Sequence, residues 1–359
     1  MRVAFFNWRD IKNPMAGGAE VYVHQILKRF VDRGNETTVF TSSFPNCKRE
    51  EVIDGVRYMR YGGRFLIYPK SYLCYKKHIE GNYDVIVESI NGVPFFTKFF
   101  AKEKVVSLIH QLTRENWYSG IFWPIALTGY HIEDRMLSTY KKNLAIVPSE
   151  STKSDLENLG FENVSIVYGS TDIKGQLTEA DKPTIIYLGR LTKSKRVDHV
   201  LRAFKKIKQN VANSCLWIVG DGPERDNLEK IANELGVGNA TEFFGKVSEN
   251  EKIKLFSNAS LMLFPAAREG WGLVVLEANS CGTPVIGYNV HGVRDSIKNN
   301  VNGYRVENGD IEALADSAIM LFNDGKKLKQ ISETSMKYSK KFSWSRASLE
   351  FEKLIGENK

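Results

Sequence analysis

The stretch FPAAREGWGLVVLEANSCGTPVIGYNVHGVRD, residues 264–295, decides the fold of this chain. The apolar residues 261–264, which lead into this stretch, predict a short buried strand, and residues 273–280 predict a helix. Gly282, with Pro284 behind it, predicts the end of that helix. The stretch therefore predicts a strand, a loop over residues 266–272 and a helix.

Two glycines, Gly270 and Gly272, flank the start of this helix. Side chains are absent there, and the first N–H groups of a helix have no partner within the helix. An anion can therefore bind directly to backbone donors at the positive end of the helix dipole. We expect a phosphate group at this position.

Two carboxylates frame the same helix start. Glu269 lies on the loop just before it, and Glu277 lies one turn beyond Leu273 on the same face. A carboxylate accepts two hydrogen bonds side by side, which suits the vicinal diol of a sugar or a ribose. The alternative is that Glu269 only stabilises the helix dipole and that Glu277 is a solvated or salt-bridged helix residue.

The spacing of these residues resembles a known signature. The segment EGWGLVVLEANSCGTPVI is similar to EGFGLxxLEAMAxGxPV, the donor-site signature of the family-four retaining glycosyltransferases. The matching residues are Glu269, Gly270, Gly272, Leu273, Glu277, Ala278, Gly282 and Pro284. The resemblance implies a GT-B fold, which has two Rossmann-like domains with parallel sheets facing a central cleft. It also implies transfer of a sugar from a nucleotide-sugar donor to an acceptor.

The resemblance assigns roles within this stretch. Glu269 is expected to be catalytic and to contact the transferred sugar, and Glu277 is expected to bind the ribose diol of the donor. The donor site is expected to continue over the backbone and side chains of Gly270, Trp271, Gly272 and Leu273.

Length and composition are consistent with two soluble domains. The chain has 359 residues, with 42% hydrophobic and 26% charged residues, and its most hydrophobic patch, 121–127, is too short to span a membrane. The first residues lead directly into a predicted strand, so we expect no signal peptide. The four cysteines have no paired spacing, which indicates a reducing, cytoplasmic location without a disulfide framework.

The first half of the chain predicts a parallel α/β domain. A strand over residues 2–7 leads through Gly17 and Gly18 into a helix that ends at Gly34. The glycine pair alone is typical of a plain turn, but the segment GGAE resembles the family's N-terminal glycine loop, which implies that Gly17 and Gly18 bind the donor. Further strands are predicted at residues 37–41, 84–88, 104–109, 144–148 and 165–168.

His110 directly follows the predicted strand 104–109, at its carboxyl end. Ligands of doubly wound domains bind at this end of the strands. A histidine here can equally be a structural residue with satisfied hydrogen bonds. The resemblance implies a catalytic role close to the transferred sugar, in which neutral imidazole would donate to a sugar hydroxyl.

The domain boundaries follow from composition. The polar segment from about Gly169 to Lys182 predicts the interdomain linker, which gives a first domain over residues 1–172 and a second over 173–340. The last segment, 341–359, predicts a helix, and the resemblance implies that this helix crosses back to the first domain.

The second domain begins with a predicted strand over residues 184–188, followed by GRLTKSK. Arg190 and Lys195 in this segment resemble the two cations of the family's diphosphate clamp, which stabilise charge on the leaving phosphate. GDGPER has Arg225 where a dinucleotide fingerprint would have its third glycine, so a dehydrogenase is not indicated. Val247 is assigned to the edge of the nucleotide base by the resemblance alone.

Together with the absence of an acidic metal-binding motif, the resemblance thus implies a metal-independent, retaining hexosyltransferase. The donor would be a UDP- or GDP-sugar, with no separate cofactor, and no nucleic-acid partner is expected. No Asp-x-Asp motif occurs, so no metal clamp is expected. Two alternatives stay open: a GT-B sugar-nucleotide epimerase and a non-catalytic sugar-nucleotide binding protein.

Residues 55–79 carry six basic and six aromatic residues and no acidic residue. The basic residues are Arg57, Arg60, Arg64, Lys70, Lys76 and Lys77, and the aromatic ones are Tyr58, Tyr61, Phe65, Tyr68, Tyr72 and Tyr75. Such a mixture suits an anionic membrane surface, with Tyr72, Tyr75 and Ile79 on one helical stripe. We expect peripheral membrane association and a lipid-linked acceptor. The alternatives are a soluble acceptor and a helix that packs this stripe on the sheet.

Overall fold

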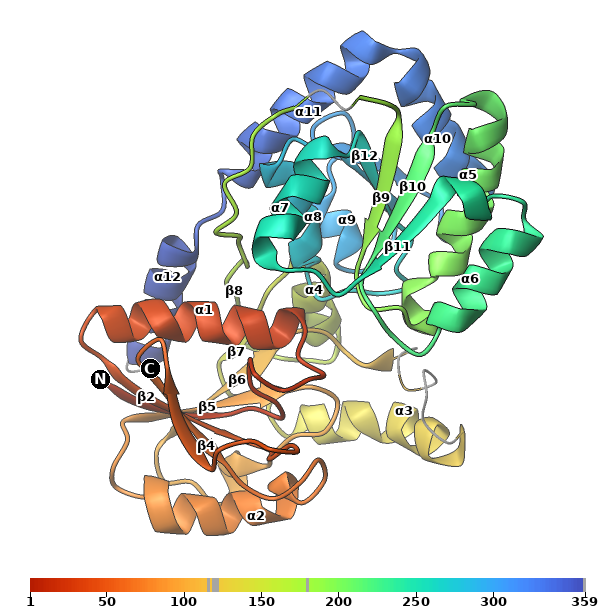
Figure 1. Cartoon of the computed structure of the whole chain (residues 1–359). Coiled ribbons are helices and arrows are strands. Elements are labelled where there is room, and N and C mark those ends of the chain that lie inside the picture. Colours follow the sequence, from red (N-terminus) through yellow and green to blue (C-terminus); the bar gives the residue numbers. More distant parts are fainter. Residues whose placement is uncertain (115–116, 118–122, 179–180, 358–359) are drawn as a thin grey trace. The chain divides into compact units, whose positions relative to one another are not determined.

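The computed structural model describes residues 1–114, 117, 123–178 and 181–357 of the chain. These residues form two compact units (Figure 1): Met1–Ser170 with Ser343–Lys359, and Thr171–Phe342. The expected boundaries, 172/173 and 340/341, differ from these by two residues each. Part of the hydrophobic patch 121–127 and two residues of the expected linker, 179–180, lie outside the described residues.

The first unit is built on an eight-stranded sheet with the order β3-β4-β2-β1-β5-β6-β7-β8. All neighbouring strands are parallel except β3 and β4. The strands are β1 (Arg2–Phe6), β2 (Glu36–Thr41), β3 (Glu50–Ile53), β4 (Val56–Arg60), β5 (Val85–Ile90), β6 (Lys104–Ile109), β7 (Ala145–Val147) and β8 (Val164–Ile166). The predicted parallel sheet is therefore confirmed for the first unit.

The β3–β4 hairpin is an element that the sequence analysis missed. Its two strands are joined by Asp54 and Gly55, which both have positive φ, at 49° and 80°. Asp-Gly is a preferred pair for two-residue hairpin turns in which both central residues adopt positive φ. The signal was present, and it places residues 56–60 in a strand next to β2.

Helices cover both faces of this sheet. Figure 1 shows α1 on one face and α2 on the opposite face. The helices are α1 (Gly18–Asp32), α2 (Ile67–Cys74) with the π-helical turn η1 (Tyr75–Ile79), the 3₁₀ turn η2 (Thr97–Phe99), α3 (Trp123–Ser138), α4 (Glu150–Asn158) and α12 (Trp344–Gly356). The last of these packs on α1, where the Ser348 hydroxyl donates to the Ile26 carbonyl at 2.8 Å.

The second unit has six parallel strands in the order β11-β10-β9-β12-β13-β14. The strands are β9 (Thr184–Leu188), β10 (Cys215–Val219), β11 (Thr241–Gly245), β12 (Leu261–Phe264), β13 (Val285–Tyr288) and β14 (Gly303–Val306). The helices and turns are η4 (Lys193–Lys195), α5 (Val197–Asn210), α6 (Arg225–Glu234), η5 (Gly238–Ala240), α7 (Glu249–Asn258), α8 (Leu273–Ser280), α9 (Val293–Ser296), α10 (Ile311–Asn323) and α11 (Gly325–Ser339).

The core of the second unit is a single apolar cluster between its sheet and helices. The strand β12 has four buried residues, as a strand covered on both faces requires. The helix α8 follows it with the predicted bounds. In the described part of the chain, no helix is both long and apolar enough to cross a membrane.

Candidate functional site

The site in the second unit is organised by the loop between β12 and α8. Gly272 occupies the N-cap position of α8 with φ of 79°, and none of the described side chains caps the helix. Gly292, also at positive φ, packs so closely that a Cβ atom there would collide with the Glu269 carbonyl. The Glu269 N–H donates to the His291 carbonyl at 3.0 Å. The two loops therefore fix the backbone around Gly270 and leave the first N–H groups of α8 without a side-chain partner.

The structure brings two predicted site residues into direct contact. The ammonium of Lys195, on η4, forms an ion pair with Oε1 of Glu269, on the loop before α8. Both side chains are mostly but not fully buried, with 16% and 17% exposed. The Ala267 N–H donates to the Ser194 carbonyl at 2.9 Å, which holds the two segments together. A cation and a carboxylate thus lie side by side next to the start of α8.

Arg190, the other predicted cation, follows β9 and is exposed. Its carbonyl accepts a hydrogen bond from the Tyr187 hydroxyl at 3.2 Å. Among the described residues, its guanidinium forms no ion pair. It can therefore turn toward an anion without breaking an existing contact.

Glu277, on α8, forms an ion pair, as the salt-bridged alternative for this residue anticipated, but with a partner that the sequence did not identify. Its Oε1 lies 3.2 Å from the ammonium of Lys252, on α7, which also contacts Glu249 at 2.9 Å. Burial raises the pKa of Glu277, and the Lys252 ammonium partly offsets this rise. Nothing in the sequence marks Lys252, because the pair depends on how α7 packs beside α8.

Three further residues of the second unit that were predicted to bind the donor have different surroundings. Trp271 is buried, and its ring contacts the Phe342 ring edge-on at 5.3 Å between centroids. Its side chain is therefore part of the packing. Leu273 is the first residue of α8, and Val247, after β11, is half-buried against the apolar core.

The glycines of GDGPER have a structural explanation. A Cβ atom on Gly220 would collide with the Gly189 carbonyl, and one on Gly222 would collide with the Leu191 carbonyl. These glycines allow the loop after β10 to pack directly against the loop that carries Arg190. Close packing of two loops thus accounts for both glycines without a dinucleotide.

His110, in the first unit, follows β6 as expected. Its side chain is buried and its ring contacts Tyr22 edge-on, with centroids 5.1 Å apart. Burial lowers its pKa to about 4, so the imidazole is neutral near pH 7. Nε2 is buried and makes no hydrogen bond with the described residues. Burial thus favours the neutral imidazole that hydrogen bonding to a sugar hydroxyl would need, while the catalytic role of His110 stays a prediction.

Gly17 and Gly18 form the start of α1. Gly17 is the N-cap residue, and its N–H donates to Oε2 of Glu20 at 2.7 Å. Glu20, which the GGAE segment contains, thus closes the first turn by a capping interaction. This hydrogen bond holds Gly17 against the first turn of α1.

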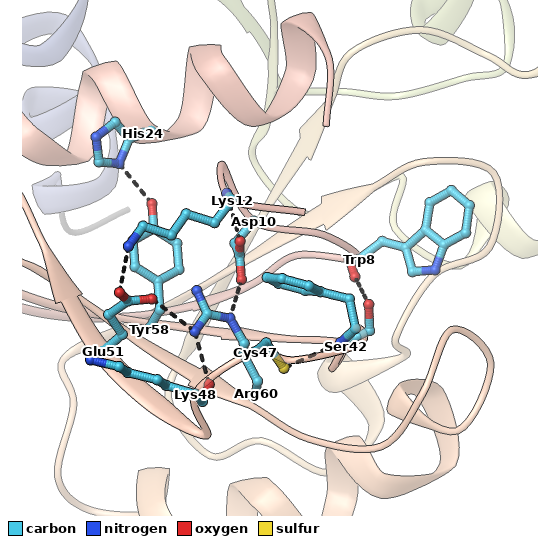
Figure 2. A network of polar contacts seen from close by, with 11 residues as sticks. Trp8, Asp10, Lys12, His24, Ser42, Cys47, Lys48, Glu51, Tyr58 and Arg60 are labelled. Carbon is cyan, nitrogen blue, oxygen red and sulfur yellow. Dashed lines mark hydrogen bonds and ion pairs between the residues drawn. The ribbon is translucent and has the colours of Figure 1, made fainter. Parts of the chain in front are cut away.

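A buried polar network holds the rest of the loop between β1 and α1 (Figure 2). Nε of Arg60, at the end of β4, donates to Asp10 at 2.6 Å, and both side chains are almost completely buried. Arg60 also donates to Glu51 at 3.1 Å and to the Lys48 carbonyl at 2.8 Å, and Glu51 pairs with Lys12. The β3–β4 hairpin is thereby tied to the loop that leads to Gly17.

The structure corrects the prediction for residues 55–79. The proposed lipid-facing stripe is wrong for Tyr75 and Ile79, which are fully buried in the core of the first unit. Arg60 is buried in its ion pair, so it is not available to lipid phosphates. The alternative, a helix that packs this stripe on the sheet, is right for the inner side of α2 and η1.

A metal site is not apparent in the described part of the chain, where no group of three or more His, Cys, Asp or Glu side chains is arranged to hold an ion. The predicted site residues also divide between the units. His110, Gly17 and Gly18 belong to the first, and the others belong to the second.

Two family profiles cover most of the chain. Residues 16–174 match Glycosyltransferase Family 4, and residues 170–338 match Glycosyl transferases group 1. An uncharacterized glycosyltransferase of Methanocaldococcus jannaschii is 30% identical over 335 residues, covering 84% of each chain.

Solved structures share the fold. Sucrose-phosphate synthase from Thermosynechococcus elongatus superposes with a TM-score of 0.85 at 21% identity, covering 98% of each chain. The Anabaena protein HepE in complex with UDP-glucose gives 0.76 at 18% identity, covering 99% of each chain. The two parallel-sheet units and the glycine-flanked start of α8 agree with these matches. The chain therefore belongs to the group 1 glycosyltransferases of family 4 and has the GT-B architecture.

Proposed function

We propose that this glycosyltransferase moves a hexose from a UDP- or GDP-sugar to a sugar or lipid-linked acceptor with retention of configuration. The observation that carries the proposal is the Lys195–Glu269 ion pair beside the uncapped start of α8. It offers a cation, backbone donors and a carboxylate within one small region. These are the partners that a sugar diphosphate needs.

Donor binding would rearrange this pair. A diphosphate at the start of α8 would compete with Glu269 for the Lys195 ammonium, and Arg190 would add a second cation. Released from Lys195, the Glu269 carboxylate could accept hydrogen bonds from hydroxyls of the transferred sugar. The ion pair would thus keep both side chains in place until the donor replaces it.

The other residues would take complementary roles. Glu277 would bind the ribose diol, and the Lys252 ammonium would favour its ionised form against the burial that raises its pKa. Neutral His110 would hydrogen-bond a sugar hydroxyl through Nε2. We further propose that the leaving phosphate assists the incoming hydroxyl on the same face, which retains the anomeric configuration, and that no metal ion is required. The support for these roles is the chemistry of each side chain together with the family membership.

We also propose that the enzyme works at the cytoplasmic face of a membrane. All four cysteines are free thiols, and three of them are buried, which suits a reducing compartment. No separate cofactor enters this scheme, because the nucleotide-sugar is itself a substrate.

A panel of nucleotide sugars, each incubated with candidate acceptors, tests the proposal. We expect an acceptor-dependent glycoside with the donor's anomeric configuration by NMR. Lys195→Met should abolish transfer, while Lys193→Met, an exposed lysine on the same turn, should leave it nearly unchanged. An epimerised nucleotide sugar formed without acceptor would indicate an epimerase, and binding without any turnover would indicate a binding protein. Either result would overturn the proposal.

A further inference from the structure

The outer side of α2 exposes large apolar side chains. Phe65, Leu66 and Leu73 are 71%, 56% and 64% exposed, and Tyr72 between them is also exposed. Scattered single apolar residues are normal on protein surfaces, but a group of this kind on one short helix indicates an interaction surface. This group shares Tyr72 with the stripe predicted from the sequence, but Leu66 and Leu73 were not part of that stripe.

Spacing places these apolar residues in line with cations. Leu66 at the N-cap of α2 and Lys70 and Leu73 within it follow one another at intervals of four and three residues, which puts them on one side of the helix. Lys77 follows in the π-helical turn η1 and is also exposed. The opposite side of the same segment is packed in the core, with Ile67, Ser71, Cys74, Tyr75 and Ile79 buried. The α2 segment is therefore amphipathic, with a mixed apolar and basic outer side.

The cations of this side are not neutralised by the protein. Arg64 lies over the rings of Trp8 and Phe65, with its guanidinium carbon 5.5 and 5.2 Å from their centroids. Among the described residues, Arg64, Lys70 and Lys77 form no ion pair. By contrast, Arg57 pairs with Glu50 and Lys76 pairs with Glu80. The basic residues that stay unpaired are the ones beside the exposed leucines.

We propose that the α2 outer face, defined as Arg64, Phe65, Leu66, Lys70, Leu73 and Lys77, docks onto an anionic lipid bilayer. Apolar side chains would enter the headgroup layer, while the neighbouring cations meet lipid phosphates. Charge complementarity favours this occupant, since no acidic residue occurs within 55–79 to meet a basic partner. The inference rests on the proposed function, because docking would serve to hold the first unit close to lipid-linked acceptors.

Sedimentation with vesicles tests the proposal on the full chain without any donor. We expect pelleting with phosphatidylcholine vesicles that contain phosphatidylglycerol, weakened by high salt, and little with phosphatidylcholine alone. Lys70→Gln with Lys77→Gln should lower the partition coefficient by roughly twentyfold, since each cation contributes about fivefold. Leu66→Ser with Leu73→Ser should lower it by at least about tenfold.

Matched substitutions control for general surface changes. Leu349→Ser, on α12, removes a leucine that is 54% exposed, and Lys254→Gln removes an exposed lysine on α7. Both should leave vesicle binding unchanged. All of these positions are exposed, so we expect the thermal unfolding temperature to stay near that of the wild type, which shows that the variants fold.

Three results would overturn the proposal. The first is negligible pelleting with both kinds of vesicle, and the second is an equal loss of vesicle binding in the control variants. The third is binding to soluble polyglutamate without binding to vesicles, which would indicate an acidic protein partner. Because sedimentation needs no turnover, a failed transferase assay would leave this result intact. Equally, transfer to a water-soluble acceptor should survive both paired substitutions even if vesicle binding is lost.

Discussion

Arg60→Met should strongly destabilise the first unit, because it leaves a buried carboxylate without its counterion. The side chains of Arg60 and Asp10 are only 1% and 0% exposed, and Nε donates to the carboxylate at 2.6 Å. After the substitution, the Asp10 carboxylate keeps only one hydrogen bond from the described residues, which the Lys12 N–H donates at 2.8 Å (Figure 2). Removing one partner of a buried ion pair costs about 3 to 5 kcal/mol.

Arg57→Met is the matched control, since it makes the same change on the same strand. Arg57 pairs with Glu50 at 3.0 Å, but these side chains are 50% and 48% exposed. An exposed pair contributes only about 0 to 1 kcal/mol. The two arginines, three residues apart on β4, should therefore differ by several kcal/mol.

Hydrogen–deuterium exchange of peptides from β1 and β4 measures this difference within the first unit, without assuming that the whole chain unfolds in one step. We expect Arg60→Met to speed exchange of the slowest amides by roughly a hundredfold or more, and Arg57→Met by less than about tenfold. Asp10→Leu combined with Arg60→Met should restore part of the protection, because no unpaired charge remains. Similar exchange in both single variants would refute the reasoning.

Three further predictions concern the site. His110→Gln should remove a pH dependence of the free energy of unfolding. Burial holds the pKa of His110 near 4 in the folded protein, against 6.5 in the unfolded chain, so the unfolded state takes up the proton first as pH falls. The wild type should therefore lose about 3 kcal/mol of stability relative to the variant as pH falls from 6.5 to 4. Urea titrations at a series of pH values check this, and a constant difference would contradict it. Glu277→Gln should raise KM for the donor by roughly ten- to a hundredfold while Glu269→Gln mainly lowers kcat, and steady-state kinetics would disprove this division if both changed KM alone. Excess chelator should leave transfer unchanged; complete loss restored by magnesium or manganese would show that a metal is needed.

Local patterns in the sequence predicted many of the strands and helices. The strands Lys104–Ile109, Thr184–Leu188 and Leu261–Phe264 and the helix Leu273–Ser280 have the predicted bounds. The last three combine an apolar run or helical periodicity with a glycine or proline close to their ends, so that the local signals agree, while Lys104–Ile109 was predicted from its apolar residues alone. The β3–β4 hairpin was not predicted, although its Asp54-Gly55 pair is a typical hairpin turn.

Contacts between distant segments could not be predicted in the same way. Lys252 pairs with Glu277 across two helices, and Arg60 lies buried on Asp10 fifty residues away. An arginine in a segment of alternating basic and aromatic residues has the appearance of a surface residue, because burial of a charge depends on a partner that the local sequence does not show. For the same reason, the sequence could not distinguish the inner from the outer side of α2.

The placement of α12 also determines how the chain carries mechanical load. The Met1 amino group donates to Asn35 at 3.0 Å, and Asn35 donates to Glu352 on α12 at 2.8 Å, so both ends of the described chain are anchored in the first unit. The second unit is a continuous insertion, entered after Ser170 and left before Ser343. A force applied between the two ends should therefore peel α12 from α1 before it reaches the second unit, and single-molecule stretching should show the rupture of α12 as its first event.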